Sequence, residues 1–137
     1  MKRYQQIVKQ GSSLGAYDGD ELVGLAIAES REWNRSLWVW ELGVDREHRR
    51  SGIGTKIVEA LVHVAKHLNL RIIVCETQNT NVPAIEFYRA TGFEMGGIDE
   101  GITARQGQRR CYVPRRQIRQ QAEDAALGHL RHPFDDR

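Results

Sequence analysis

Residues 36–77 read as two short strands on either side of a helix, and few folds accommodate that order. SLWVWELGV (Ser36–Val44) is rich in the aromatic and β-branched residues that strands favour. Between Thr55 and Leu68, apolar residues recur at the spacing of a helix that buries one face. RIIVCET (Arg71–Thr77) is a mostly apolar run typical of a buried parallel strand. The segment therefore predicts a strand–helix–strand crossover with two parallel strands.

The flanking segments predict antiparallel additions to this unit. Residues 14–30 form two apolar runs around the sequence DGD, a turn signal typical of a β-hairpin. Downstream, Pro83 suits the first turn of a second helix, which Asn81 caps and Gly92 ends. Residues 93–99 (FEMGGID) then predict another strand. We expect an α+β fold, a three-layer arrangement in which flanking helices cover a mixed, mostly antiparallel sheet with a central parallel β-α-β unit.

A period of two along the strand at 36–44 assigns each side chain to a face of the sheet. It places Leu37, Val39 and Glu41 on one face and Trp38, Trp40 and Leu42 on the other. Along the chain Glu41 also stands among Trp38, Trp40 and Leu42, and apolar neighbours of this kind raise the pKa of a carboxyl group and let it take a proton.

The length of 137 residues is sufficient for one domain with a proper core. The apolar runs are too short to span a membrane, and MKRYQQIVKQ lacks the apolar core of a signal peptide. We therefore expect a cytoplasmic protein in which Cys75 and Cys111 are reduced thiols. His63 and His67 are four residues apart on the predicted helix, but they face outward without an HExxH pattern, so no metal site is expected.

Charge is distributed unevenly along the chain. Residues 101–137 hold 8 arginines, no lysine and 4 acidic residues, whereas residues 1–100 hold 12 basic and 14 acidic residues. We therefore place a boundary near Gly101, between a domain at 1–100 with its core at 14–99 and an arginine-rich C-terminal extension at 101–137. Such arginines could bind nucleic acid nonspecifically, but a solvated tail is the commoner case, so nucleic acid is not an expected partner.

DREHRRSGIGTK (Asp45–Lys56) joins the first strand of the crossover to its helix and has the composition of an anion site. The first turn of a helix has unpaired N–H groups and a favourable dipole, and glycines admit a ligand close to the backbone. Arg49 and Arg50 add positive charge. The geometry suits a pyrophosphate, although a tight turn with solvated arginines is an equal alternative from these residues alone.

Two common phosphate motifs are excluded. The sequence GxxxxGK[ST] of the P-loop is absent. A dinucleotide fingerprint would need a third glycine where GIGTKI has Ile57.

Two motifs in this order resemble the GCN5-related N-acetyltransferase (GNAT) superfamily. Arg49-x-x-Gly52-x-Gly54 after a strand is similar to its R/Q-x-x-G-x-G/A signature, and ETQNTNVPAIEFYRATGFEMGGID (Glu76–Asp99) is similar to its second cofactor region. The sequence of the second motif most resembles the streptothricin acetyltransferase branch. The resemblance covers roughly residues 14–99 and implies the acyl-CoA N-acyltransferase fold with acetyl-CoA as co-substrate.

The resemblance also implies which residues hold acetyl-CoA. The loop that binds pyrophosphate corresponds to Arg49, Arg50, Ser51, Gly52, Ile53, Gly54 and Thr55. Backbone groups of Leu42 and Val44 would pair with pantetheine, and Asn81 would contact the same arm. Tyr88 matches the tyrosine that lies near the cofactor sulfur and can protonate the thiolate; the alternative is a core tyrosine packed with Phe87 and Phe93.

Glu41 matches the acidic residue that related enzymes often use as base, directly or through water. An edge carboxylate that faces solvent, or one that only attracts a cationic acceptor, is the alternative. Trp40, Glu76 and Asp99 are further candidates for contact with the acceptor, although a solvated surface position is the commoner fate of such carboxylates.

Two departures from the family pattern stand out. About a dozen residues precede the first strand, where the family has a strand and two helices that roof the acceptor pocket; MKRYQQIVKQ could supply one helix. After GGID the sequence is atypical for the strand that completes the sheet. RRCYV predicts a brief strand and Gln117–Leu127 a polar helix, unless this tail is loosely ordered. A partner chain that covers an exposed sheet edge, as in a homodimer, is left open.

Together these features predict an acetyl-CoA-dependent N-acetyltransferase that acts on a primary amine of a small molecule, such as a streptothricin-like antibiotic. Glu41 would be the base and Tyr88 the acid. Acetylation of a protein or peptide is the nearest alternative, and a truncated, inactive CoA-binding or interaction module is the other.

Overall fold

One mixed sheet organises the structure, a computed structural model that describes residues 2–78, 80–99 and 111–117. The strands are β1 (Leu14–Asp18), β2 (Glu21–Arg31), β3 (Ser36–Val44), β4 (Ile72–Cys75), β5 (Thr77–Gln78), β6 (Glu94–Asp99) and β7 (Cys111–Gln117). Their order is β1-β2-β3-β4-β7-β5, and β6 also pairs with β7. Among the strands that the structure describes, β3 and β4 are the parallel pair and the other pairs are antiparallel. The expected α+β class, with a mostly antiparallel sheet around a β-α-β unit, is confirmed.

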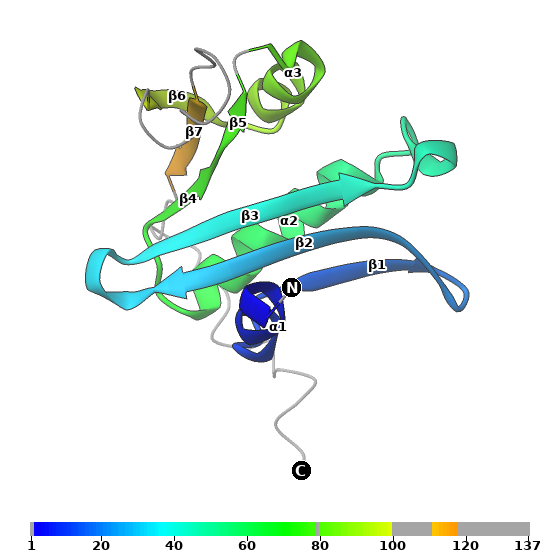
Figure 1. The fold of residues 1–137 in the computed structure, drawn as a ribbon, viewed down its shortest axis with the longest axis horizontal. Coiled ribbons are helices and arrows are strands. Elements are labelled where there is room, and N and C mark those ends of the chain that lie inside the picture. The colour runs from blue at the N-terminus through cyan, green and yellow to red at the C-terminus, as the bar shows by residue number, and fades with distance from the viewer. Residues whose placement is uncertain (1, 79, 100–110, 118–137) are drawn as a thin grey trace, which may run out of the picture.

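Helices cover both faces of the sheet (Figure 1). α2 (Ile53–His67) forms the crossover from β3 to β4 and lies behind β2 and β3 in this view, whereas α1 (Lys2–Lys9) lies in front of β2. α3 (Val82–Ala90) lies near β5 and β6. The N-terminal segment thus supplies the single helix that its sequence suggested.

The main core lies between α2 and the sheet, where the apolar periodicity predicted it. Val58 and Leu61 of α2 are at most 1% exposed and belong to one cluster with Leu37 of β3 and Ile73 of β4. α2 begins two residues before the predicted Thr55 because Ile53 and Gly54 already form its first turn.

The local signals for turns and caps are confirmed. Gly19 has a φ of 59° in the turn between β1 and β2. The Asn81 Oδ1 accepts a hydrogen bond from the Ala84 N–H at 3.3 Å and so caps α3, in which Pro83 occupies the first turn. Gly92 follows α3 with a φ of 89°. These short-range features depend on a few neighbouring residues, which is why the sequence revealed them.

The assignment of faces along β3 is right as far as Trp40, which shares a face with Trp38, and is wrong from Glu41 onward. Ala28 pairs with Val39 but Ile27 pairs with Glu41, so Trp40 is an extra residue in a β-bulge. Leu42 and Val44 therefore pack against the α2 core together with Leu37 and Val39. Glu41 lies on the other face, which a strict period of two could not predict.

β7 lies inside the sheet rather than at its end. It pairs with β4 and then β5 along one edge (Ile72 with Gln117, Thr77 with Tyr112) and with β6 along the other (Ile98 with Tyr112). The predicted strand RRCYV is thus confirmed but begins two residues later and extends to Gln117. The edge of β4 is therefore covered by this chain itself. Apart from Gln117, the predicted helix at Gln117–Leu127 lies outside the described residues.

One arginine of the C-terminal segment has a structural partner. Arg116 donates a hydrogen bond from Nη1 to the carbonyl of Thr91 at 2.8 Å, just after α3. Its guanidinium lies 3.3 Å from where a Cβ on Gly92 would be. This side chain therefore ties β7 to the end of α3 instead of extending into solvent.

Candidate active site

The parallel strands β3 and β4 separate halfway along β3. Their pairing runs from Ser36 with Ile72 to Val39 with Cys75, and β3 then continues to Val44 without β4 beside it (Figure 1). On its other edge this part of β3 remains paired with β2. Backbone groups of this stretch that point away from β2 therefore face the side where a ligand could lie along the strand, as is expected for Leu42 and Val44, although the Val44 carbonyl already accepts a hydrogen bond from Arg49.

The glycine-bearing loop follows directly from this free edge. A short 3₁₀ turn at Arg46–His48 leads to Arg50 and Gly52, which have φ angles of 64° and 83°. The positive φ at Gly52 explains the glycine, and no atom lies within 4 Å of the position of its missing Cβ. α2 begins at the next residue without a side-chain cap. Its first N–H groups and its dipole therefore face an open position suited to an anion.

Gly54 allows α2 and α3 to approach closely. A Cβ on Gly54 would lie 3.0 and 3.1 Å from two ring atoms of Phe87, which is tighter than ordinary contacts. The second glycine of the motif thus fixes the spacing between the two helices that carry the predicted cofactor residues. This role differs from the predicted one, in which the glycine keeps the backbone open to the ligand.

Polar contacts hold the loop in this conformation. The His48 Nδ1 lies 2.9 Å from the Asp45 Oδ2, and its Nε2 lies 3.6 Å from the Asp18 Oδ2. The hydrogen bond raises the pKa of His48 and lowers that of Asp45. Arg49 donates from Nε to the Val44 carbonyl at 3.3 Å, and the Ser51 hydroxyl donates to the His48 carbonyl. Arg49 and Arg50 remain exposed, so both can still reach an anion.

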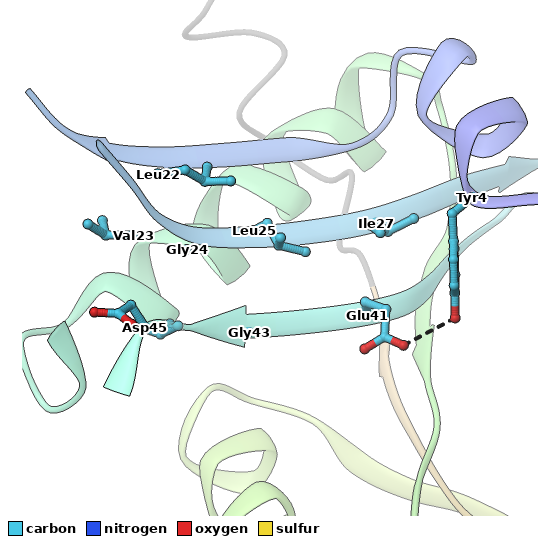
Figure 2. Close-up of a pocket in the computed structure, with 10 residues that line it drawn as sticks. Tyr4, Leu22, Val23, Gly24, Leu25, Ile27, Glu41, Gly43 and Asp45 are labelled. Atoms are coloured by element: carbon cyan, nitrogen blue, oxygen red, sulfur yellow. Dashed lines mark hydrogen bonds between the residues drawn. The ribbon is translucent and has the colours of Figure 1, made fainter. Parts of the chain in front are cut away.

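Glu41 lies on the α1 side of the sheet, and its carboxylate is exposed. The Tyr4 hydroxyl of α1 donates a hydrogen bond to Glu41 Oε1 at 3.1 Å (Figure 2). Of its expected neighbours, Trp38 and Trp40 lie on the same face as Glu41, whereas the bulge puts Leu42 on the opposite face. Glu41 also borders a groove.

The groove has a volume of about 530 Å³ and follows β2 and β3 (Figure 2). Its walls include apolar side chains of β2, and carboxylates of β3 and of the following loop. The lining residues are Tyr4, Leu22, Val23, Gly24, Leu25, Ile27, Glu41, Gly43, Val44 and Asp45. Such a groove suits a ligand with a cationic group on a partly apolar body.

Tyr88 is 8% exposed and packs between Phe87 and Phe93, with ring centroids 5.6 and 5.2 Å away. Burial raises its pKa, and the neighbouring Cys75 thiol and the Glu41 carboxylate add to that effect. The hydroxyl therefore stays protonated well above neutral pH, as a proton donor requires. Burial likewise raises the pKa of Cys75 to about 12, so this thiol is not a thiolate.

Trp40 is held on the α1 face by charged neighbours. Its Nε1–H donates to the Glu29 Oε2 at 3.0 Å, and the Arg3 guanidinium lies 4.3 Å from the centre of its ring. Trp40 thus lies beside Glu41 but does not line the groove.

The remaining predicted residues are not among the described residues that line the groove. Asn81 caps α3 through its side-chain oxygen, and its contact with pantetheine stays a prediction. Glu76 is half-buried at the break between β4 and β5. Asp99 ends β6, where its backbone pairs with Cys111, but its side chain lies outside the described part of the structure.

The site thus brings Glu41, Tyr88 and the glycine loop to the region where β3 and β4 separate. Sequence reasoning missed Tyr4 and the groove residues of β2, because their contacts with β3 join distant parts of the chain. The apolar run LVGLAIA predicted a strand but did not indicate what each face of it would meet.

Two features are absent from the described residues. No helix among residues 2–78, 80–99 and 111–117 is long and apolar enough to cross a membrane. In the same part of the chain, no three His, Cys, Asp or Glu side chains are grouped as metal ligands would be.

The sequence profile of the acetyltransferase (GNAT) family matches residues 2–93. A streptothricin acetyltransferase of Streptomyces lavendulae is 32% identical over 99 residues, which cover 70% of this chain and 52% of that protein. The chain thus spans about half the length of the streptothricin acetyltransferases it matches in Streptomyces lavendulae and Escherichia coli.

Solved structures resemble the fold. A Bacillus anthracis protein assigned as a streptothricin acetyltransferase, in complex with acetyl coenzyme A, superimposes with a TM-score of 0.73 and 25% identity over 78% of this chain and 62% of that one. Arabidopsis thaliana Naa50, in complex with the bisubstrate analogue CoA-Ac-MVNAL, gives a TM-score of 0.74 with 25% identity over 85% of this chain and 80% of that one.

Proposed function

Because the chain belongs to the acetyltransferase (GNAT) family, we propose that it transfers an acetyl group from acetyl-CoA to a primary amine. One observation supports the proposal: β3 parts from β4 after Val39 and then carries Glu41 and leads to the glycine loop, while Cys75 at the end of β4 neighbours the Tyr88 hydroxyl. A site with these parts can hold an extended anionic co-substrate on one side and a cationic acceptor on the other.

The residues fit acetyl-CoA as co-substrate. The first N–H groups of α2, with the exposed Arg49 and Arg50, would hold the pyrophosphate. The free edge of β3 at Leu42 and Val44 would pair with the amide groups of pantetheine, as an added strand would. When bound, acetyl-CoA supplies the activated acetyl group.

The chemistry then needs two proton transfers. The acceptor must lose a proton to attack as a free amine, and Glu41 is the carboxylate placed at the groove to take it, directly or through water. As the new C–N bond forms and the C–S bond breaks, the leaving thiolate gains a proton from Tyr88. The raised pKa of Tyr88 keeps that proton available.

The acceptor is a small molecule that carries a primary amine. Glu41 and Asp45 supply negative charge to the groove, and Leu25 and Ile27 supply apolar surface. The likeness to streptothricin acetyltransferases favours a streptothricin-like antibiotic.

A peptide N-terminus is the second candidate. The groove follows β2 and β3 in the direction an extended chain would take, and Naa50 shares the fold. A peptide acceptor would be bound through its backbone, whereas an antibiotic would depend on the carboxylates of the groove.

Two measurements test the proposal. Acetyl-CoA should raise the melting temperature of the protein, and failure at millimolar concentration would rule out the co-substrate. Thiol release should then be assayed with nourseothricin, a set of simple diamines and short peptides with free N-termini. Binding of acetyl-CoA without release of thiol above hydrolysis would identify an inactive CoA-binding module instead.

A further inference from the structure

α1 contacts the bulge of β3 through two adjacent residues. The Arg3 guanidinium lies 4.3 Å from the ring centre of Trp40, and the Tyr4 hydroxyl lies 3.1 Å from Glu41 Oε1. The helix is anchored below these contacts by Ile7, which is 4% exposed. The chain after α1 is anchored as well, since the Ser13 hydroxyl accepts from the Ala28 N–H at 3.1 Å.

Without this helix, the Glu41 carboxylate would have little to hold it. Its side chain is exposed, and in the described residues its hydrogen-bond partner is Tyr4. A glutamate has three rotatable side-chain bonds, so a free carboxylate would occupy many positions relative to an acceptor amine. A base must stand within hydrogen-bond reach of the proton it removes.

The contact leaves the second oxygen of Glu41 available. Figure 2 shows Oε1 bonded to Tyr4, while the other carboxylate oxygen points away from Tyr4, toward the part of the groove near Gly43. Tyr4 also lines the groove itself, at the end next to Glu41. One residue of α1 therefore both fixes the carboxylate and limits the space in front of it.

We propose that Tyr4 is a positioning residue that orients the Glu41 carboxylate toward the acceptor amine and closes this end of the groove. The inference rests on the proposed function, because it assigns a partner to the proposed base. It also gives α1 a role in the reaction, although the helix contributes no residue to the cofactor motifs.

The test compares Tyr4→Phe with the wild type, using acetyl-CoA and the best acceptor from the amine set. Loss of the hydroxyl should lower kcat on the order of tenfold, because misplacement of a reacting group is costly. The KM for acetyl-CoA and the melting temperature should stay unchanged. Tyr17→Phe makes the same chemical change at a residue of β1 that is 66% exposed, and should behave as the wild type.

A double-mutant cycle tests whether Tyr4 affects kcat through Glu41. Combined with Glu41→Gln, Tyr4→Phe should cause no further loss, because the group it positions is already gone. A loss of the same size in both backgrounds overturns the inference. So does wild-type activity of Tyr4→Phe when Glu41→Gln is impaired, whereas full activity of Glu41→Gln contradicts the proposed function instead.

A titration without any acceptor tests the contact itself. Glu41 raises the pKa of Tyr4, chiefly through the hydrogen bond. The difference between the ultraviolet pH titrations of the wild type and of Tyr4→Phe isolates this hydroxyl. The difference between Glu41→Gln and the double variant Tyr4→Phe/Glu41→Gln gives the pKa of Tyr4 without its carboxylate partner, and this pKa should be lower than in the wild type. An unchanged pKa of Tyr4 would overturn the inference even if no acceptor were found.

Discussion

The cofactor half of the site consists of the free edge of β3, the loop from Arg46 and the first turn of α2 with α3, whereas the acceptor half is the groove of β2 and β3 with α1 and Asp45. The cofactor half offers mainly backbone: a free strand edge, a glycine with positive φ and the first N–H groups of a helix. The acceptor half offers side chains from three separate elements. Backbone groups do not depend on side-chain identity, so they suit a co-substrate that stays the same. Side chains can differ between proteins and so suit different acceptors. Mutations should therefore separate the two halves cleanly.

The largest effect should come from the acceptor half. Glu41→Gln removes the proposed base and should lower kcat about 10²–10⁴-fold, the usual contribution of a positioned base. The acetyl-CoA-induced rise in melting temperature should stay as in the wild type. A parallel loss of acetyl-CoA binding would show that the halves are not separate.

Tyr88→Phe should have the next largest effect. Loss of the proton donor should reduce kcat about tenfold to a hundredfold, measured by thiol release. Because the pKa of Tyr88 is raised from 10.0, the wild-type rate should not fall between about pH 8 and pH 10 through loss of this proton. A decline that Tyr88→Phe abolishes would contradict this assignment.

Gly54→Val tests the cofactor half alone. The added side chain would meet the Phe87 ring, and overpacking of this kind costs about 1–3 kcal/mol. We expect acetyl-CoA affinity to fall about tenfold, as measured by calorimetry, because α2 and α3 move apart. Gly97→Ala is the matched control, since a Cβ there meets no atom within 4 Å.

The smallest effect concerns pH. The raised pKa of His48 means that its charged form adds stability below its ordinary pKa of 6.5, and this contribution is lost as the pH rises through the folded value. The pKa of Asp45 is lowered from 3.8, so its carboxylate stabilises the folded state above that pH. This stabilisation is lost as the pH falls through the lowered pKa. His48→Gln should therefore lower the melting temperature by about 1–2 °C near pH 5.5 and leave it unchanged near pH 8.5. Equal differences at both pH values would mean that the charge of His48 plays no part.

The same division explains how much the sequence could predict. The crossover from β3 to β4, the Asn81 cap and the glycine turn are determined by residues close in sequence, and all were predicted. The bulge at Trp40 was not, because it depends on pairing with β2. The Tyr4–Glu41 contact joins residues 37 positions apart and leaves no local pattern. The cofactor half was therefore predictable in outline, and the acceptor half was not.

The position of β7 between β4 and β6 also determines when the fold can be completed during synthesis. β7 begins at Cys111, 36 residues after β4 ends at Cys75. At about 5–20 residues per second, a ribosome needs about 2–7 s to make that stretch. Throughout this time β4 has an unpaired edge, a template for association with other chains. The nascent protein thus depends on β7, which is made late, to cover the edge of β4. A ribosome that pauses between these two strands should therefore increase aggregation.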